Sequence, residues 1–171
     1  MTEVSLNFRA AAYAQESGVF PIALITMTHP SWSVPVRFSG DPTQRLIETA
    51  SEIVYGTQSN GEDYYFFPGI LKLPDDTDDG PRRMEFEFSN VNREYVQQIR
   101  AITGRIAVDV SLVMSNALDD LEGQWPEFNV VDISYDAGFV RLVMETETLN
   151  NEPYPYGIYG PNWFTGLFRG L

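Results

Sequence analysis

The segment RRMEFEF, residues 82–88, alternates apolar side chains with charged ones. Met84, Phe86 and Phe88 share one face of this segment when it is extended, because successive side chains of a β-strand point to opposite sides. This alternation is typical of a strand with one face in the core and the other in water. It predicts a protein whose core is built on β-strands.

Several other segments carry a strand pattern and are bounded by turn residues. Pro35 restricts one of them, SVPVRFS, to the edge of a sheet, because proline has no N–H to donate to a neighbouring strand. The segment RLIETASEIVYG fits a helix or a broken strand, and its ending IVY favours the strand. The other predicted strands are residues 19–30, residues 64–74 with a break at Pro68-Gly69, residues 105–115, and a hairpin of 128–135 and 139–147.

The apolar period changes to three or four residues between Ser89 and Gly104. Val91, Tyr95 and Ile99 recur at this spacing, which predicts a helix over about 91–103. A short N-terminal helix is also expected, with Leu6, Phe8, Ala12 and Tyr13 near one face and Gly18 as its stop. The predicted fold is therefore mainly β: an antiparallel sandwich or barrel with one packed helix and a short N-terminal one.

The chain has 171 residues, enough for one domain with a substantial core, and carries 24 acidic against 11 basic side chains. Its formal charge of −13 disfavours sequence-specific binding to nucleic acid and binding to anionic membranes. No apolar run is long enough for a transmembrane helix, and the polar N-terminus does not fit a signal peptide, so synthesis in a cytoplasm is expected.

The absence of cysteine and the single histidine exclude thiolate and clustered imidazole metal sites. We expect no metal and no cofactor.

Three motifs invite a catalytic or metal-binding interpretation, and each has a simpler one. The loop DDTDDGP resembles the start of a calcium loop, but Thr77 and Phe86 stand where two ligands are required. An acidic turn is the simpler interpretation, and its aspartates are expected to be exposed to solvent: Asp75, Asp76, Asp78 and Asp79.

His29 and Ser31 are too close in sequence for a typical catalytic pair, and a hydrogen bond at a turn is expected instead. Glu145 and Glu147 share one strand face, where two solvated acids are expected in place of a glycosidase pair. No phosphate loop or dinucleotide fingerprint occurs.

The end of the chain, residues 149–171, differs in composition from residues 1–148 and is expected to form an extended arm. Proline and glycine exclude a long helix or a central strand there. Six aromatic side chains nevertheless need cover from water. These proposed assembly residues are Tyr154, Tyr156, Tyr159, Trp163, Phe164 and Phe168.

The sequence NEPYPYGIYGPNWFTGLF resembles the C-terminal signature of a family of tailed-bacteriophage tail proteins, a domain-of-unknown-function family of minor tail and tail-tip proteins. Three further stretches resemble the same family, so the resemblance covers nearly the whole chain. They are AAYAQESGVFPIALITMTHP, LPDDTDDGPRRMEFEFSNVNREYVQQIRAITG and VVDISYDAGFVRLVMETETLNNEPYP. Thr165 departs from the family pattern, because it occupies the place of a proline.

The resemblance implies a virion component at the tip of a long noncontractile tail, with a tail-tube-like β-sandwich or barrel and no enzymatic activity. The implied partners are other tail proteins: the tail tube, the distal tail, the hub or the central fibre. A homo-oligomeric ring is expected, in which each aromatic arm docks into grooves of the next subunit. Docking of the arm on its own domain is the alternative. The competing functions are an acidic DNA mimic or inhibitor, and a small hydrolase that uses His29.

Overall fold

The computed structural model describes residues 5–49, 53–74, 82–89, 104–136 and 138–147. In these ranges the chain forms one helix and a ten-stranded sheet, so the mainly β prediction is confirmed. The predicted helix at about 91–103 lies outside the described residues. The elements are α1 (Leu6–Tyr13), β1 (Pro21–Thr28), β2 (Val36–Ser39), β3 (Gln44–Glu48), β4 (Ile53–Ser59), β5 (Glu62–Phe66), β6 (Gly69–Lys72), β7 (Arg83–Ser89), β8 (Ala107–Met114), β9 (Ala117–Tyr135) and β10 (Phe139–Thr146).

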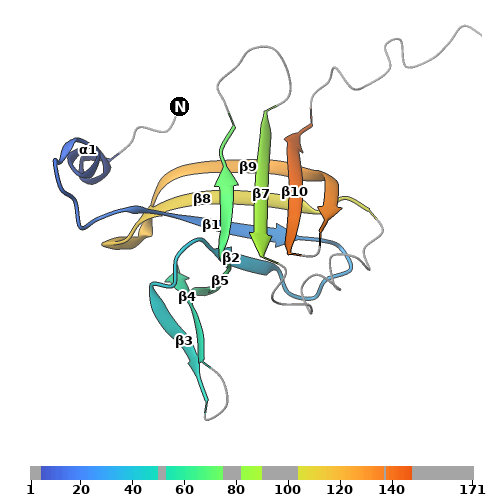
Figure 1. Cartoon of the computed structure of the whole chain (residues 1–171), viewed down its shortest axis with the longest axis horizontal. Coiled ribbons are helices and arrows are strands. Elements are labelled where there is room, and N and C mark those ends of the chain that lie inside the picture. The colour runs from blue at the N-terminus through green and yellow to red at the C-terminus, as the bar shows by residue number, and fades with distance from the viewer. Residues whose placement is uncertain (1–4, 50–52, 75–81, 90–103, 137, 148–171) are drawn as a thin grey trace, which may run out of the picture.

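The strands follow the order β3-β4-β5-β2-β1-β8-β9-β10-β7-β6 in the sheet. Their pairings are antiparallel except for β2 and β5, which run parallel. The sheet is therefore mixed, although an antiparallel one was expected. Strands β6, β7 and β10 cross over β1, β8 and the first part of β9, so the sheet folds back into a sandwich-like or barrel-like body (Figure 1).

The core lies between these crossing layers. Met27 and Phe38 come from one layer, and Phe86 and Phe88 come from the other. The alternation that first indicated a strand is present in β7, where Met84, Phe86 and Phe88 are buried. These three side chains lie opposite Met144, Leu142 and Val140 of β10, which are also buried. Strands β7 and β10 therefore turn their apolar side chains toward the same core.

Strand β9 joins the two layers. Its first part pairs with β8 and its second part with β10, with register shifts along both pairings. The predicted hairpin of 128–135 and 139–147 is confirmed, but β9 starts eleven residues earlier, at Ala117. Glu127 has a φ of 65°, and this left-handed backbone follows Pro126. The register with β8 shifts at this point, as in a β-bulge. The bend allows β9 to pass from one layer into the other.

The prediction that Pro35 restricts its segment to a sheet edge is wrong. Strand β2 pairs with β1 on one side and with β5 on the other. It begins at Val36, so the missing N–H of Pro35 falls just before the ladder.

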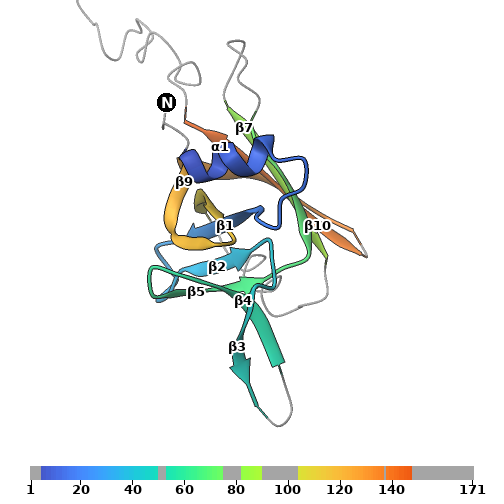
Figure 2. The same ribbon diagram turned by 90° about the vertical axis from the view of Figure 1, so that its left-hand side faces the viewer.

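Strands β3 and β4 form a hairpin that projects from the body of the molecule (Figure 2). The segment RLIETASEIVYG is thus divided between two strands. The next turn, between β4 and β5, is the Asn-Gly pair Asn60 and Gly61, whose φ angles are 50° and 78°. Positive φ at both positions is what a type I′ hairpin turn requires, and Asn-Gly is its preferred pair.

The short N-terminal helix is present as α1, but its apolar side chains are arranged differently from the prediction. Phe8 is half-buried, whereas Leu6, Ala12 and Tyr13 are exposed, so the four side chains do not form one packed face. The helix ends before Gly18, because the chain becomes extended at Ala14. Among the described residues, no helix has both the length and the apolar character needed to cross a membrane.

Candidate functional site: surfaces and contacts

Helix α1 is attached to the sheet by a buried carboxylate. Glu122 of β9 is 5% exposed and accepts hydrogen bonds from the backbone N–H of Ser5, at 3.0 Å, and from its hydroxyl, at 2.5 Å. The Ser5 oxygen also accepts from the backbone N–H of Phe8 at 3.1 Å, which caps the helix. Asn7 and Asn116 add an amide pair at 2.9 Å. Polar contacts at its first turn therefore position a helix that has no buried residue.

Replacement of Ser5 by alanine should release this attachment. The change removes the N-cap, which costs about 1 kcal/mol, and leaves the buried Glu122 carboxylate without a side-chain donor, which adds about 1–3 kcal/mol. We expect a lower free energy of unfolding and faster amide hydrogen exchange in α1. Ser5→Asp is no substitute, because it would place two carboxylates together, whereas Ser5→Thr keeps the hydroxyl and should restore slow exchange. Unchanged exchange in Ser5→Ala would show that the contact does not hold the helix.

The projecting hairpin exposes apolar side chains. Ile47 of β3 and Ile53 and Tyr55 of β4 are exposed large hydrophobic residues. Ile53 and Tyr55 lie on one face of the hairpin, since they are two residues apart in a strand. Their cross-strand partners are Glu48 and Arg45. Those two form an ion pair with an N–O distance of 3.4 Å.

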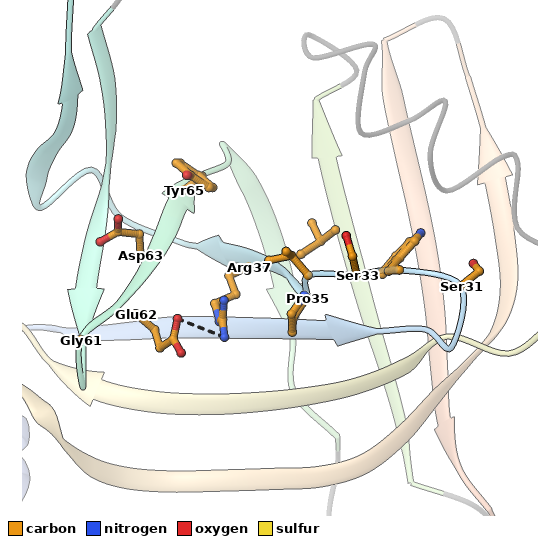
Figure 3. A pocket seen from close by; sticks show the side chains of 11 residues that line it. Ser31, Ser33, Pro35, Arg37, Gly61, Glu62, Asp63 and Tyr65 are labelled. Carbon is orange, nitrogen blue, oxygen red and sulfur yellow. Dashed lines mark ion pairs between the residues drawn. The ribbon is translucent and has the colours of Figure 1, made fainter.

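A pocket of about 590 Å³ lies between residues 31–37 and the turn that joins β4 to β5. Figure 3 shows the side chains of Arg37 and Glu62 pointing toward each other within it. They form an ion pair of 3.1 Å that connects β2 with β5. Glu62 is about half exposed, so this pair adds little to stability. The remaining lining mixes Trp32 and Tyr65 with serines and Asp63.

His29 and Ser31 do contact each other, next to this pocket. The His29 Nδ1 atom lies 2.6 Å from the Ser31 hydroxyl and accepts from the Ser31 backbone N–H at 3.2 Å. The Trp32 backbone N–H donates to the His29 carbonyl at 2.9 Å and closes the turn. The predicted hydrogen bond at a turn is therefore present. A nucleophile and base also need a third group that orients the base, and none of the described contacts joins a carboxylate to His29.

The two predicted surface acids lie at the end of β10. Glu145 pairs in register with Arg83 and Asn129, and Glu147 contacts Arg105 in an exposed ion pair. Glu147 is thus an exposed acid just beyond the end of the strand, whereas Glu145 is half-buried within it. Within the described ranges, no cluster of three or more histidine, aspartate or glutamate side chains could hold a metal ion. The acidic loop with Asp75, Asp76, Asp78 and Asp79 lies outside those ranges.

Charged side chains form a ladder on the outer face of β6, β7 and β10. Lys72 contacts Glu85 at 3.1 Å, and Arg141 contacts Glu87 at 2.7 Å. The Lys72 hydrogen bond and charge lower the pKa of Glu85, and Glu87 raises the pKa of Arg141. A carboxyl whose pKa is lowered in the folded state stabilises that state above its ordinary pKa, and the contribution is lost as the pH falls through the lowered value.

The Glu85 pKa gives a direct test of this ladder. A carbon-13 NMR titration should give a Glu85 midpoint below the ordinary glutamate value of about 4.3. Lys72→Met should raise that midpoint, because it removes both the hydrogen bond and the charge. Arg45→Met, at the distant hairpin, is the matched control and should leave it unchanged. A Glu85 midpoint that does not respond to Lys72→Met would contradict the assignment.

The six proposed assembly residues of the arm, Tyr154, Tyr156, Tyr159, Trp163, Phe164 and Phe168, also lie outside the described residues. The structure thus leaves their docking as a prediction.

Sequence reasoning missed Glu122, since an acid between Leu121 and Gly123 carries no periodic signal. The only sequence sign of this contact was Ser5, a good N-cap residue before LNFRAAAY.

The described fold and surfaces define a mainly β protein with one attached helix and a projecting hairpin. No protein-family model matches the chain, and a search of curated proteins finds no match.

Proposed function

We propose that the chain is a structural subunit of a bacteriophage tail tip or baseplate, as a distal-tail ring or an adaptor near the hub. The four sequence stretches that resemble the tail-protein family support the class of protein. The mainly β fold agrees with the architecture that this resemblance implies. The protein would be made in the bacterial cytoplasm and would function in the virion.

The structural observation that carries the proposal is the exposure of large apolar side chains on projecting elements. Leu6 and Tyr13 of α1, together with Ile53 and Tyr55 of the hairpin, face solvent in the single chain. Exposed apolar residues that gather on projecting elements are typical of surfaces that bind another protein. The aromatic arm adds six further rings in sequence.

The proposed partners are other copies of the chain and the neighbouring tail proteins. The acidic charge has a role in this arrangement, because acidic surfaces toward a central channel would repel DNA and let it pass. The proposed subunit needs no cofactor and no catalytic residue. Its function consists of contacts that position the next protein of the tail.

Mass measurement tests the proposal. The purified full chain would be measured alone and mixed with the tail proteins encoded beside it, and negative-stain images would be taken of the products. The proposal expects an oligomer of the chain, or a stable complex with a tail protein. A chain that joins no tail protein but binds a nuclease tightly would instead support the acidic DNA mimic.

A further inference from the structure

The pocket beside the β4–β5 turn has two aromatic residues in its lining. Its volume of about 590 Å³ falls within the range of ligand-binding pockets, and its exposed residues include Ser33 and Asp63. Trp32 and Tyr65 both line the pocket, and both are half-buried. A ligand in this pocket therefore meets the apolar surface of two rings as well as polar side chains.

The walls of the pocket are held in place by contacts within the chain. Trp32 packs against the main core, and its ring meets the His29 ring edge to face, with the ring centres 5.9 Å apart. Tyr65 belongs to the pairing between β5 and β2. The backbone N–H of Asn60, in the β4–β5 turn, donates to the Asp119 carboxylate at 2.6 Å. The pocket is thus formed before a ligand arrives, which lowers the entropy cost of binding.

Hydrogen-bond donors and acceptors accompany the two rings. Figure 3 shows Arg37 between Tyr65 on one side and Ser33 on the other. The guanidinium of Arg37 only donates, whereas the ionised carboxylates of Glu62 and Asp63 only accept. The ion pair joins one terminal nitrogen of Arg37 to one oxygen of Glu62 at 3.1 Å. A guanidinium has several N–H groups and a carboxylate several lone pairs, so this pair retains the capacity to bond a ligand.

This combination favours a sugar over the other common ligand classes. A sugar hydroxyl both donates and accepts, so it satisfies Arg37 and the two carboxylates alike. The C–H groups on the face of a sugar ring also pack well on an aromatic ring, whose face is negative. A phosphate or another anion is disfavoured, because the pocket has two acids and one cation and the chain has a formal charge of −13. A proline-rich peptide lacks the N–H groups that would replace water at the carboxylates.

We propose that this pocket binds a neutral oligosaccharide, with sugar rings packed on Trp32 and Tyr65 and sugar hydroxyls bonded to Arg37, Glu62 and Asp63. The ion pair between Arg37 and Glu62 holds both groups in the orientation that the ligand meets. The inference is carried by the lining of the pocket alone. It goes beyond the proposed role in assembly and holds whether or not the chain belongs to a phage tail.

Fluorine NMR of the full chain labelled with 5-fluorotryptophan tests the inference, because each of the three tryptophans then gives its own signal. The probes are three neutral trisaccharides: cellotriose, maltotriose and chitotriose. We expect at least one of them to shift the Trp32 signal, with a dissociation constant of about 1 mM, and to leave the Trp125 signal in place. If none of the three shifts the Trp32 signal at about 10 mM, the inference is wrong.

A trimer of glucuronic acid tests the preference for a neutral ligand. It is the charged counterpart of cellotriose, and its carboxylates would approach those of Glu62 and Asp63. We expect it to bind about tenfold more weakly than the best neutral trisaccharide. Equal binding of the charged trimer would overturn the assignment to a neutral sugar.

Variants of the pocket are compared by saturation-transfer NMR, which observes the sugar and does not need the Trp32 signal. Trp32→Ala should abolish binding, and Asp63→Ala should weaken it about tenfold. Asp63 is exposed, so its replacement leaves the fold intact and the test does not depend on the partly buried Trp32 alone. The matched controls are Tyr13→Ala and Asp132→Ala, which change exposed residues outside the pocket and should bind as the natural chain does. Full binding by both pocket variants would overturn the inference.

A peptide with the sequence of residues 151–161, NEPYPYGIYGP, tests the competing occupant, which is the arm of the chain itself. We expect the peptide to leave the Trp32 signal unchanged. If the peptide shifts this signal and the sugars do not, the pocket is a docking groove for the arm. That outcome overturns the sugar site and supports the proposed assembly function, so the two proposals fail separately.

Discussion

A chain that ends at Thr148 will fold but will not assemble. The deletion removes the arm with its six aromatic side chains and leaves the strands and their core in place. Each ring that docks on a neighbouring subunit contributes about 1.5–3 kcal/mol before the cost of ordering the arm. The loss of six rings therefore removes enough free energy of association to prevent assembly. Light scattering and circular dichroism measure the two outcomes.

The control for this deletion is a chain that ends at Arg169, which keeps all six aromatic residues and should assemble normally. Single replacement of Trp163 by alanine should give an intermediate result, with assembly weakened by about ten- to 100-fold. If the arm instead covers its own domain, the chain ending at Thr148 will assemble and will unfold more easily. That outcome would contradict docking between subunits.

Replacement of Phe88 by alanine should lower the free energy of unfolding by about 3–5 kcal/mol. Phe88 is 0% exposed and lies in a cluster of rings. Its ring centre is 5.1 Å from that of Phe86 and 5.2 Å from that of Phe67, which it meets edge to face. The cavity would open where the two layers of strands meet, so the surrounding side chains cannot easily close it. Urea unfolding measures the change.

Phe139→Ala is the matched control, since Phe139 begins the adjacent strand β10 and is 53% exposed. It removes the same side chain and should change the unfolding free energy by about 0.5 kcal/mol or less. A loss at Phe88 as small as that at Phe139 would mean that the ring cluster is not the centre of the core.

The strands with regular alternation could be predicted from sequence. Strand β7 is the clearest case, because each apolar residue of MEFEF faces the core and each acid faces out. Strand β8 follows the same rule up to Val110 and then departs from it, since a register shift buries Val113 while Leu112 is only half-buried. Alternation was therefore a sufficient guide for β7 but not for the end of β8, where the register with β9 shifts on both sides of Val113.

The first part of β9 could not be predicted in this way. Residues 117–127 contain Gly123, Pro126 and several acids, all of which are uncommon in strands. They are extended because β8 pairs with them across a tight turn, which is a tertiary effect. The same limit applies to Glu122, whose partner Ser5 is 117 residues away. A contact of that separation leaves no local pattern in the sequence.

The β3–β4 hairpin lies beyond β5 at one end of the strand order, while β2 and β5 pair directly through Phe38 with Tyr65 and Ser39 with Phe66. Because β2 and β5 pair directly, the β3–β4 hairpin only extends the sheet beyond β5. A change in the length of the hairpin therefore need not shift the register of the central strands. Insertions or deletions at this hairpin should therefore leave the aromatic interior formed by Phe38, Phe67, Phe86 and Phe88 in place.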